Sequence, residues 1–233
     1  MEKEKTRSDG GSGWNIDLIE FSVVLVAAPI DPSILNPDFL RHNEIVDAHW
    51  QVQDPRISTP AFSQATFTGG LTVTADPERV IFAQSGNSLS PEDIACPEIA
   101  KRYVEQVPHI YRAVGINPKG RRRSDGEVIY RIADALIDKG AWMSFNDVTP
   151  DIQLKAIYRY PRRTVSLDII EAQPRAGARG GIPGMLFQAN IHHDITETNP
   201  QARINTLLSI INSWREDLSD FWSIVAKFDL EKR

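Results

Sequence analysis

Apolar and polar residues alternate along several stretches of the chain, which is the pattern of strands that bury one face. The first stretch covers residues 15–28, and its second half is apolar on both faces, as is typical of a strand in the middle of a sheet. Tight turns at Gly69-Gly70 and Asp76-Pro77-Glu78 join three further strands in the first half of the chain. The remaining predicted strands are 62–68, 71–75, 79–83, 110–116, 152–158, 165–169 and 185–191.

A helical period of apolar residues predicts helices over 33–42, 97–107, 125–139 and 200–229. Pro97 suits the first position of its helix, Ser124 and Glu127 form a capping box, and Asn199 is expected to cap the last helix. That last helix would be about 45 Å long if it were unbroken, so the sequence allows a break within 213–219. Leu208 and Trp222 are predicted to be core residues of this helix.

The order of these elements predicts an α+β protein in which antiparallel sheets pack against helices. The order strand, helix, three strands, helix occurs twice, which suggests a tandem duplication that divides near Pro108. The predicted organisation is a disordered tail at 1–13, a first half at 14–107, and a second half at 108–233 that packs with the first as one unit. Deleting the tail is expected to leave stability unchanged.

Composition is that of an ordinary globular protein, with 41% hydrophobic and 24% charged residues. The single cysteine, Cys96, excludes an intrachain disulfide and a cysteine-based zinc site. The first residues are charged and rich in glycine, so we expect no secretory signal, no membrane association and a cytoplasmic location. Residues 101–180 carry 15 Lys and Arg against 9 Asp and Glu, although the whole chain has a net charge of −5.

This basic segment is the candidate site for an anion or a nucleic acid. Arginines precede the predicted helix at 125–139, and others lie among tyrosines around the hairpin turn at Pro161, where they could contact phosphates and bases. A solvated connector and a basic hairpin tip explain the same residues. The candidate residues are Lys119, Arg121, Arg122, Arg123, Arg159, Arg162 and Arg163.

Other polar residues suggest no catalytic, cofactor or metal site. The glycine-rich loop at 175–184 joins two strands and lacks a Lys-Ser/Thr ending, so we interpret it as a hairpin loop and not as a phosphate cradle. His192 and His193 are neighbours on a strand and point to opposite faces, which prevents them from sharing a metal ion. Cys96 precedes a helix, where its thiol pKa could be lowered, but a small capping residue explains it as well.

Three segments carry a resemblance to a known family. They are Pro32-Ser-Ile-Leu-Asn-Pro-Asp-Phe39, Tyr111-Arg-Ala-Val-Gly-Ile-Asn117 and Asn212-Ser-Trp-Arg-Glu-Asp-Leu218. They resemble a sporadically distributed family of uncharacterised bacterial proteins that has no assigned activity. The resemblance implies a prokaryotic soluble protein and carries over no site residue.

Two functions remain open from the sequence. The first is a non-enzymatic accessory protein that binds a protein partner or itself, which the five tryptophans favour because aromatic residues concentrate at interfaces. The second is a nucleic-acid-binding accessory protein that uses residues 119–163. An enzyme would require residues that converge from distant segments, which a single sequence does not reveal.

Overall fold

The computed structural model describes residues 16–123, 152–172 and 184–229, with a few positions between 132 and 148. The expected tail at 1–13, most of the helix at 125–139 and most of the loop at 175–184 lie outside the described residues. Ile132, from the predicted helix at 125–139, is among the described residues and is fully buried.

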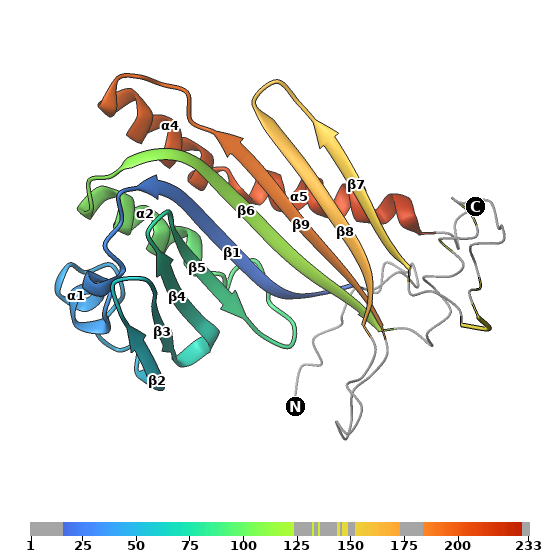
Figure 1. The fold of residues 1–233 in the computed structure, drawn as a ribbon, viewed down its shortest axis with the longest axis horizontal. Coiled ribbons are helices and arrows are strands. Elements are labelled where there is room, and N and C mark those ends of the chain that lie inside the picture. Colours follow the sequence, from blue (N-terminus) through green and yellow to red (C-terminus); the bar gives the residue numbers. More distant parts are fainter. Residues whose placement is uncertain are drawn as a thin grey trace, which may run out of the picture.

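Among the described residues, one antiparallel sheet of nine strands organises the chain (Figure 1), in the order β2-β3-β4-β5-β1-β6-β9-β8-β7. The two central strands, β1 and β6, pair with each other over most of their length. The strands are β1 (Asp17–Ala28), β2 (Val52–Ser58), β3 (Ser63–Phe67), β4 (Leu71–Asp76), β5 (Arg79–Ser85), β6 (Ile110–Arg123), β7 (Gln153–Arg159), β8 (Arg163–Ala172) and β9 (Gly184–Asp194).

Helices cover one face of this sheet, behind the strands in Figure 1. Helix α2 packs on β1 and β5, α4 on β6 and α2, and α5 on β6 and β9. The predicted α+β class with antiparallel strands packed on helices is therefore confirmed. The helical elements are η1 (Pro32–Ile34), α1 (Pro37–His42), η2 (Thr68–Gly70), α2 (Cys96–Gln106), α4 (Pro200–Asn212), α5 (Trp214–Val225) and η4 (Ala226–Phe228).

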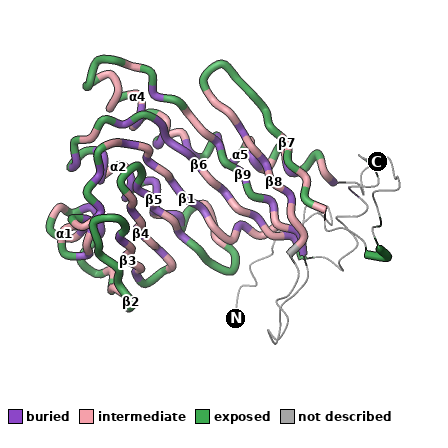
Figure 2. The backbone as a smooth tube through the Cα atoms, viewed as in Figure 1, coloured by how far each residue is buried: buried purple, intermediate pink, exposed green. Residues whose placement is uncertain are grey.

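The core lies between the sheet and these helices, and residues of both contribute to it. Figure 2 shows the buried stretches along the central strands. The core follows the alternation in the sequence, because every second residue of a strand faces the helices. In β1 the buried side chains include Phe21, Val23 and Leu25, and in β9 they include Phe187 and Ile191. No helix among the described residues is long and apolar enough to cross a membrane.

Strand β6 is longer than predicted, because it continues past Ile116 to Arg123. Pro118 and Gly120 mark a connector in most sequences, but here both lie inside a strand that pairs with β1. The β6–β9 ladder is interrupted between Ile116 and Lys119, where Pro118 lacks a backbone N–H. Residues 119–123 are therefore part of the sheet, and the prediction that they form a solvated connector was wrong.

The closing helix is divided at Ser213, inside the range that its length suggested. Asn199 caps α4 by accepting a hydrogen bond from the Ala202 N–H at 3.0 Å. Ser213 leaves the helical conformation, and its hydroxyl donates to the Ile210 carbonyl at 3.1 Å. The break lets two straight helices follow the twisted sheet.

Leu208 and Trp222 are half-buried and pack against the core without being part of it. Leu207, the neighbour of Leu208, has no exposed surface. We therefore expect Leu208→Ala to lower the free energy of unfolding by about 1 kcal/mol, well below the cost of a fully buried leucine. Urea titration measures the difference, and a loss equal to that of Leu207→Ala would contradict it.

Candidate interaction surface at the edge strand β7

Strand β7 forms one edge of the sheet, and within the described residues it pairs on one side only, with β8. The hairpin is closed by the Tyr160 N–H, which donates to the Arg163 carbonyl at 2.8 Å. In an antiparallel strand, the N–H and C=O groups of one residue point toward the neighbouring strand, and those of the next residue point to the other side. The N–H and C=O groups of Gln153, Lys155, Ile157 and Arg159 therefore point away from β8, toward the open edge.

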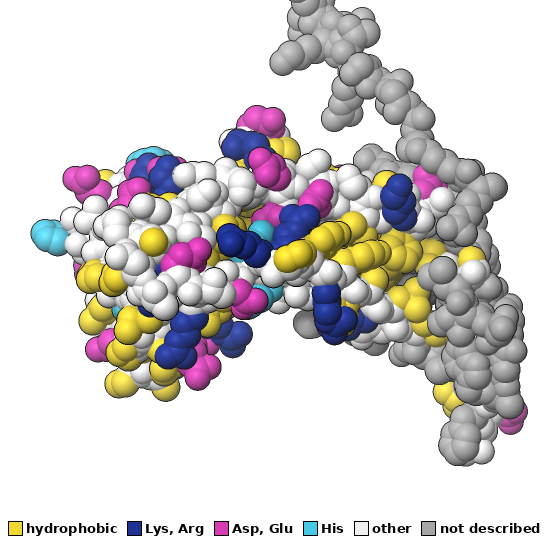
Figure 3. Space-filling model, turned by 90° about the horizontal axis from the view of Figure 1, so that it is seen from above, with side chains coloured by type: hydrophobic (Ala, Val, Ile, Leu, Met, Phe, Trp, Pro, Cys, Tyr) yellow, Lys and Arg dark blue, Asp and Glu magenta, His cyan; other side chains and the backbone are white. Residues whose placement is uncertain are grey.

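Large apolar side chains are exposed along this strand and its turn. Ile157 is 44% exposed, Tyr158 is 37% exposed and Tyr160 is 46% exposed. Seen from above, hydrophobic side chains form a band in the region where β7 and α5 lie, with Lys and Arg side chains beside it (Figure 3). An exposed edge strand with apolar side chains is a template on which another strand can pair.

The opposite edge of the sheet, β2, is less suited to strand pairing. It contains Pro55, which has no N–H to donate, and its register with β3 shifts between Gln53 and Ile57. Proline and irregular register are common devices by which proteins block an edge. The two edges of this sheet therefore differ, and β7 is the regular one.

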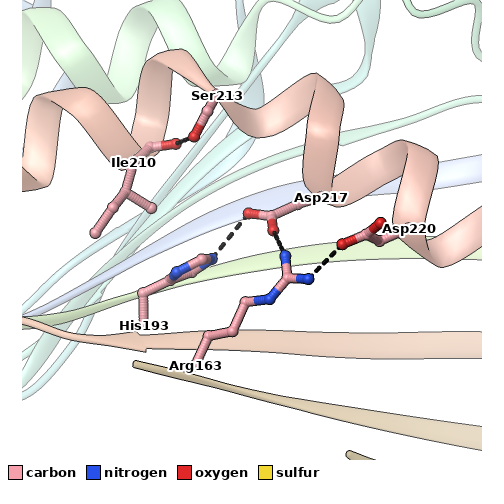
Figure 4. Close-up of polar contacts among 6 residues, drawn as sticks. All are labelled: Arg163, His193, Ile210, Ser213, Asp217 and Asp220. Carbon is pink, nitrogen blue, oxygen red and sulfur yellow. Dashed lines mark hydrogen bonds and ion pairs between the residues drawn. The ribbon is translucent and has the colours of Figure 1, made fainter. Parts of the chain in front are cut away.

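An ion-pair cluster centred on the buried Asp217 holds the β7–β8 hairpin against α5 (Figure 4). Arg163, at the start of β8, donates to Asp217 Oδ1 at 2.9 Å and also to Asp220. His193 on β9 bonds to the other Asp217 oxygen, with 2.9 Å between Nε2 and Oδ2. The Asp217 side chain is only 4% exposed, so both of its oxygens are satisfied by these two partners.

The electrostatics of the cluster keep Arg163 charged. Burial acts to lower the pKa of the Arg163 guanidinium, but hydrogen bonds and the negative charges of Asp220 and Asp217 raise it above its ordinary value. The same guanidinium lies 4.9 Å from the centre of the Tyr160 ring, a cation–π contact at the hairpin turn. Arg163 thus fixes the position of the end of the edge strand.

A cavity of about 670 Å³ opens beside this cluster. It lies between the hairpin turn, the end of β9 and α4, and its polar lining includes Arg162, His193, Glu197 and Ser209. Of these, His193 is already bonded to Asp217. This bond is one more contact that ties β9 to α5.

The seven candidate basic residues do not converge on one surface. Lys119, Arg121 and Arg123 lie on the sheet face opposite the helices, whereas Arg122 is buried on the helix face at 8% exposure. Arg159 is level with Gly115 of β6 through the registers of β7, β8 and β9. Arg121 lies six positions beyond Gly115, which is roughly 20 Å along a strand.

The remaining members of the basic set also have separate surroundings. Arg162 is in the hairpin turn, and Arg163 is engaged by Asp217 and Asp220 on the helix face. The convergence that a nucleic-acid surface was expected to need is not found, and binding of nucleic acid stays a prediction without geometric support.

The histidines and the cysteine have structural surroundings. His192 lies opposite Gly115 and contacts Asp194 at 3.1 Å, whereas His193 faces α5, so the two do point to opposite faces. No group of three His, Cys, Asp or Glu side chains in the described ranges is placed to hold a metal ion. Cys96 is fully buried, and burial raises the pKa of its thiol, opposite to what a reactive thiolate requires.

Comparison with known proteins adds no family. No protein-family model matches the chain, and no curated protein matches its sequence. The resemblance to the uncharacterised bacterial family stays a prediction.

Sequence reasoning missed the cluster that holds the hairpin. Arg163 and Asp217 are 54 positions apart. The spacing of residues along the chain does not predict a contact between the first residue of a strand and a residue inside a distant helix. Asp217 offered one signal, because it falls between Trp214 and Leu218 on the apolar stripe of α5. A carboxylate on a buried stripe requires a partner.

Proposed function

We propose that this chain is a non-enzymatic interaction protein that binds a protein partner by adding one extended strand of the partner to β7. The observation that carries the proposal is the open edge of β7, which presents outward N–H and C=O groups beside exposed Ile157 and Tyr158. In strand addition, main-chain hydrogen bonds supply affinity and alternate side chains supply specificity.

A tandem duplication of the chain is part of this proposal. In the first half β1 pairs with β5, followed by β4 and β3; in the second half β6 pairs with β9, followed by β8 and β7. The strand β7 thus occupies the place of β3. Because β3 carries β2 on its outer side, the first half supports the idea that this position accepts one more strand.

The clamp at Arg163 supports the same function. A docking edge binds better when it is held in its bound shape beforehand, because less conformational entropy is lost on association. Arg163, His193 and Asp217 tie the end of the hairpin to α5 and so provide such rigidity.

Selection of short extended peptides tests this proposal. A display library of random peptides is panned on the purified chain, and the affinities of the selected peptides are measured by fluorescence anisotropy. We expect Ile157→Lys to weaken their binding at least tenfold, about 1.4 kcal/mol, because a lysine on an edge strand opposes pairing.

Ile57→Lys is the matched control, because Ile57 lies on the other edge strand and is 43% exposed against 44% for Ile157. This variant should bind the selected peptides as the unmodified chain does. Peptides that bind both variants equally would show that the strand is not captured at β7. Thermal melting of both variants establishes that neither change unfolds the protein.

A further inference from the structure

We infer that the strand added to β7 is the β7 strand of a second copy of this chain, antiparallel, around a two-fold axis that passes between the two Ala156 residues. This inference rests on the proposed function and names the partner. It makes one sheet that continues from the first copy into the second, with the helices of both copies on the same side.

The backbone restricts the registers that are available. A two-fold axis perpendicular to the sheet keeps each face on its own side, so paired residues must share a face. The outward hydrogen-bonding groups belong to residues 153, 155, 157 and 159, and these must meet one another. An axis at any residue of β7 satisfies both conditions, and the axes at Lys155, Ala156 and Ile157 pair the most residues. The axis at Lys155 would place this lysine opposite its own copy, and like charges directly opposite each other are destabilising.

The axis at Ala156 gives the more complementary set of neighbours. It brings all seven residues of β7 into the ladder, with Lys155 opposite Ile157 and Gln153 opposite Arg159. Ala156 then faces itself at a non-hydrogen-bonded position, where side chains approach most closely. The smallest side chain of the strand therefore occupies the tightest place.

The half-exposed apolar side chains on the helix face also find partners in this register. Leu154 of each copy lies opposite Tyr158 of the other, and aromatic–aliphatic pairs of this kind stabilise sheets. Tyr158 is 37% exposed in the single chain. The axis at Ile157 instead places Lys155 opposite Arg159, and like charges directly opposite each other are destabilising.

Among the described residues, the main sheet contacts of helix α5 are with β6 and β9, which are more central strands than β7. Two seven-residue strands bury a small interface. We therefore expect a reversible dimer whose dissociation constant is in the micromolar range. The dimer therefore forms at concentrations that sedimentation can sample.

Sedimentation velocity over roughly 1 to 200 µM protein, the range in which small interfaces dissociate, gives the first test. The unmodified chain and Ile57→Lys are expected to shift together from monomer to dimer. Ile157→Lys should remain monomeric, because its new ammonium group would lie opposite Lys155 of the second copy. A chain that stays monomeric at the highest concentration overturns the inference.

Disulfide cross-linking tests the register. Ala156→Cys places two thiols at a facing pair whose Cα atoms are about 4.5 Å apart, within the reach of a disulfide. Ile157→Cys is the control, because its two copies would be offset along the strand beyond that reach. Cys96 is fully buried and stays in both variants.

We expect a covalent dimer from Ala156→Cys and little from Ile157→Cys under mild oxidation. The reverse result would place the axis at Ile157 and overturn the register proposed. Peptides that bind at β7 while the chain does not self-associate would overturn the second copy as partner and leave strand addition intact. Absence of both kinds of binding would remove both proposals.

Discussion

Replacement of Phe221 by alanine is expected to lower the free energy of unfolding by about 4 kcal/mol. Phe221 has no exposed surface, and its ring lies 4.7 Å from the ring of Trp222, centre to centre. It rests on the backbone of Gly120, where an added Cβ would lie 3.4 Å from the Phe221 ring. Removal of the ring leaves a cavity between α5 and β6 that rigid strands cannot close.

The matched control is Phe62→Ala, because Phe62 is 36% exposed. Its truncation should cost less than about 1 kcal/mol, since little apolar surface returns to water. Urea titration measures the free energy of unfolding of both variants, and an unchanged slope of the transition confirms two-state behaviour. A similar loss in both variants would mean that α5 does not seal the core.

Replacement of Asp217 by alanine is expected to cost about 3 kcal/mol. Its carboxylate bonds to both Arg163 and His193, and the variant removes this partner from both side chains. Because the site is largely buried, water does not fully replace the lost bonds. Arg163 retains Asp220 and is 26% exposed, which keeps the loss near the lower end for a broken buried ion pair. Thermal and urea unfolding measure the effect.

Asp220→Ala supplies the comparison on the same helix. The Asp220 side chain is 44% exposed, so its bond to Arg163 is screened by solvent and should contribute less than about 1 kcal/mol. If the two variants lose equal stability, the buried carboxylate is not the centre of the clamp. Hydrogen exchange of the β7–β8 hairpin should rise in Asp217→Ala and change little in Asp220→Ala.

The strands with regular alternation were predictable from the sequence. Val73 and Ala75 in β4, and Phe187 and Ile191 in β9, are buried on the face that the period of two indicated. Strand β2 was missed, because Pro55 and a shift of register remove the alternation from that edge. Residues 119–123 were misassigned because a run of arginines resembles a solvated turn, although neighbouring strands hold it in the sheet.

The interaction surface was only partly predictable. Tyr158, Tyr160 and Arg163 drew attention as a cluster around a turn, and the structure places them together at the end of the edge strand. Whether a strand is central or at an edge depends on the order of strands in the sheet, which the sequence of this chain does not encode locally. The partners of Arg163 come from a helix far along the chain for the same reason.

The pairing of β1 with β6 has a consequence for synthesis of the chain. Strand β1 is apolar on both faces near Val24 and Val26, and β6 follows it only after more than 80 residues. A ribosome therefore releases β1, the β3–β5 meander and α2 while one long side of β1 still has no neighbour. Non-local pairing of this kind forms slowly, and until it forms the unpaired edge of β1 is exposed to aggregation. The nascent first half thus keeps one side of β1 unpaired until residue 123 has emerged.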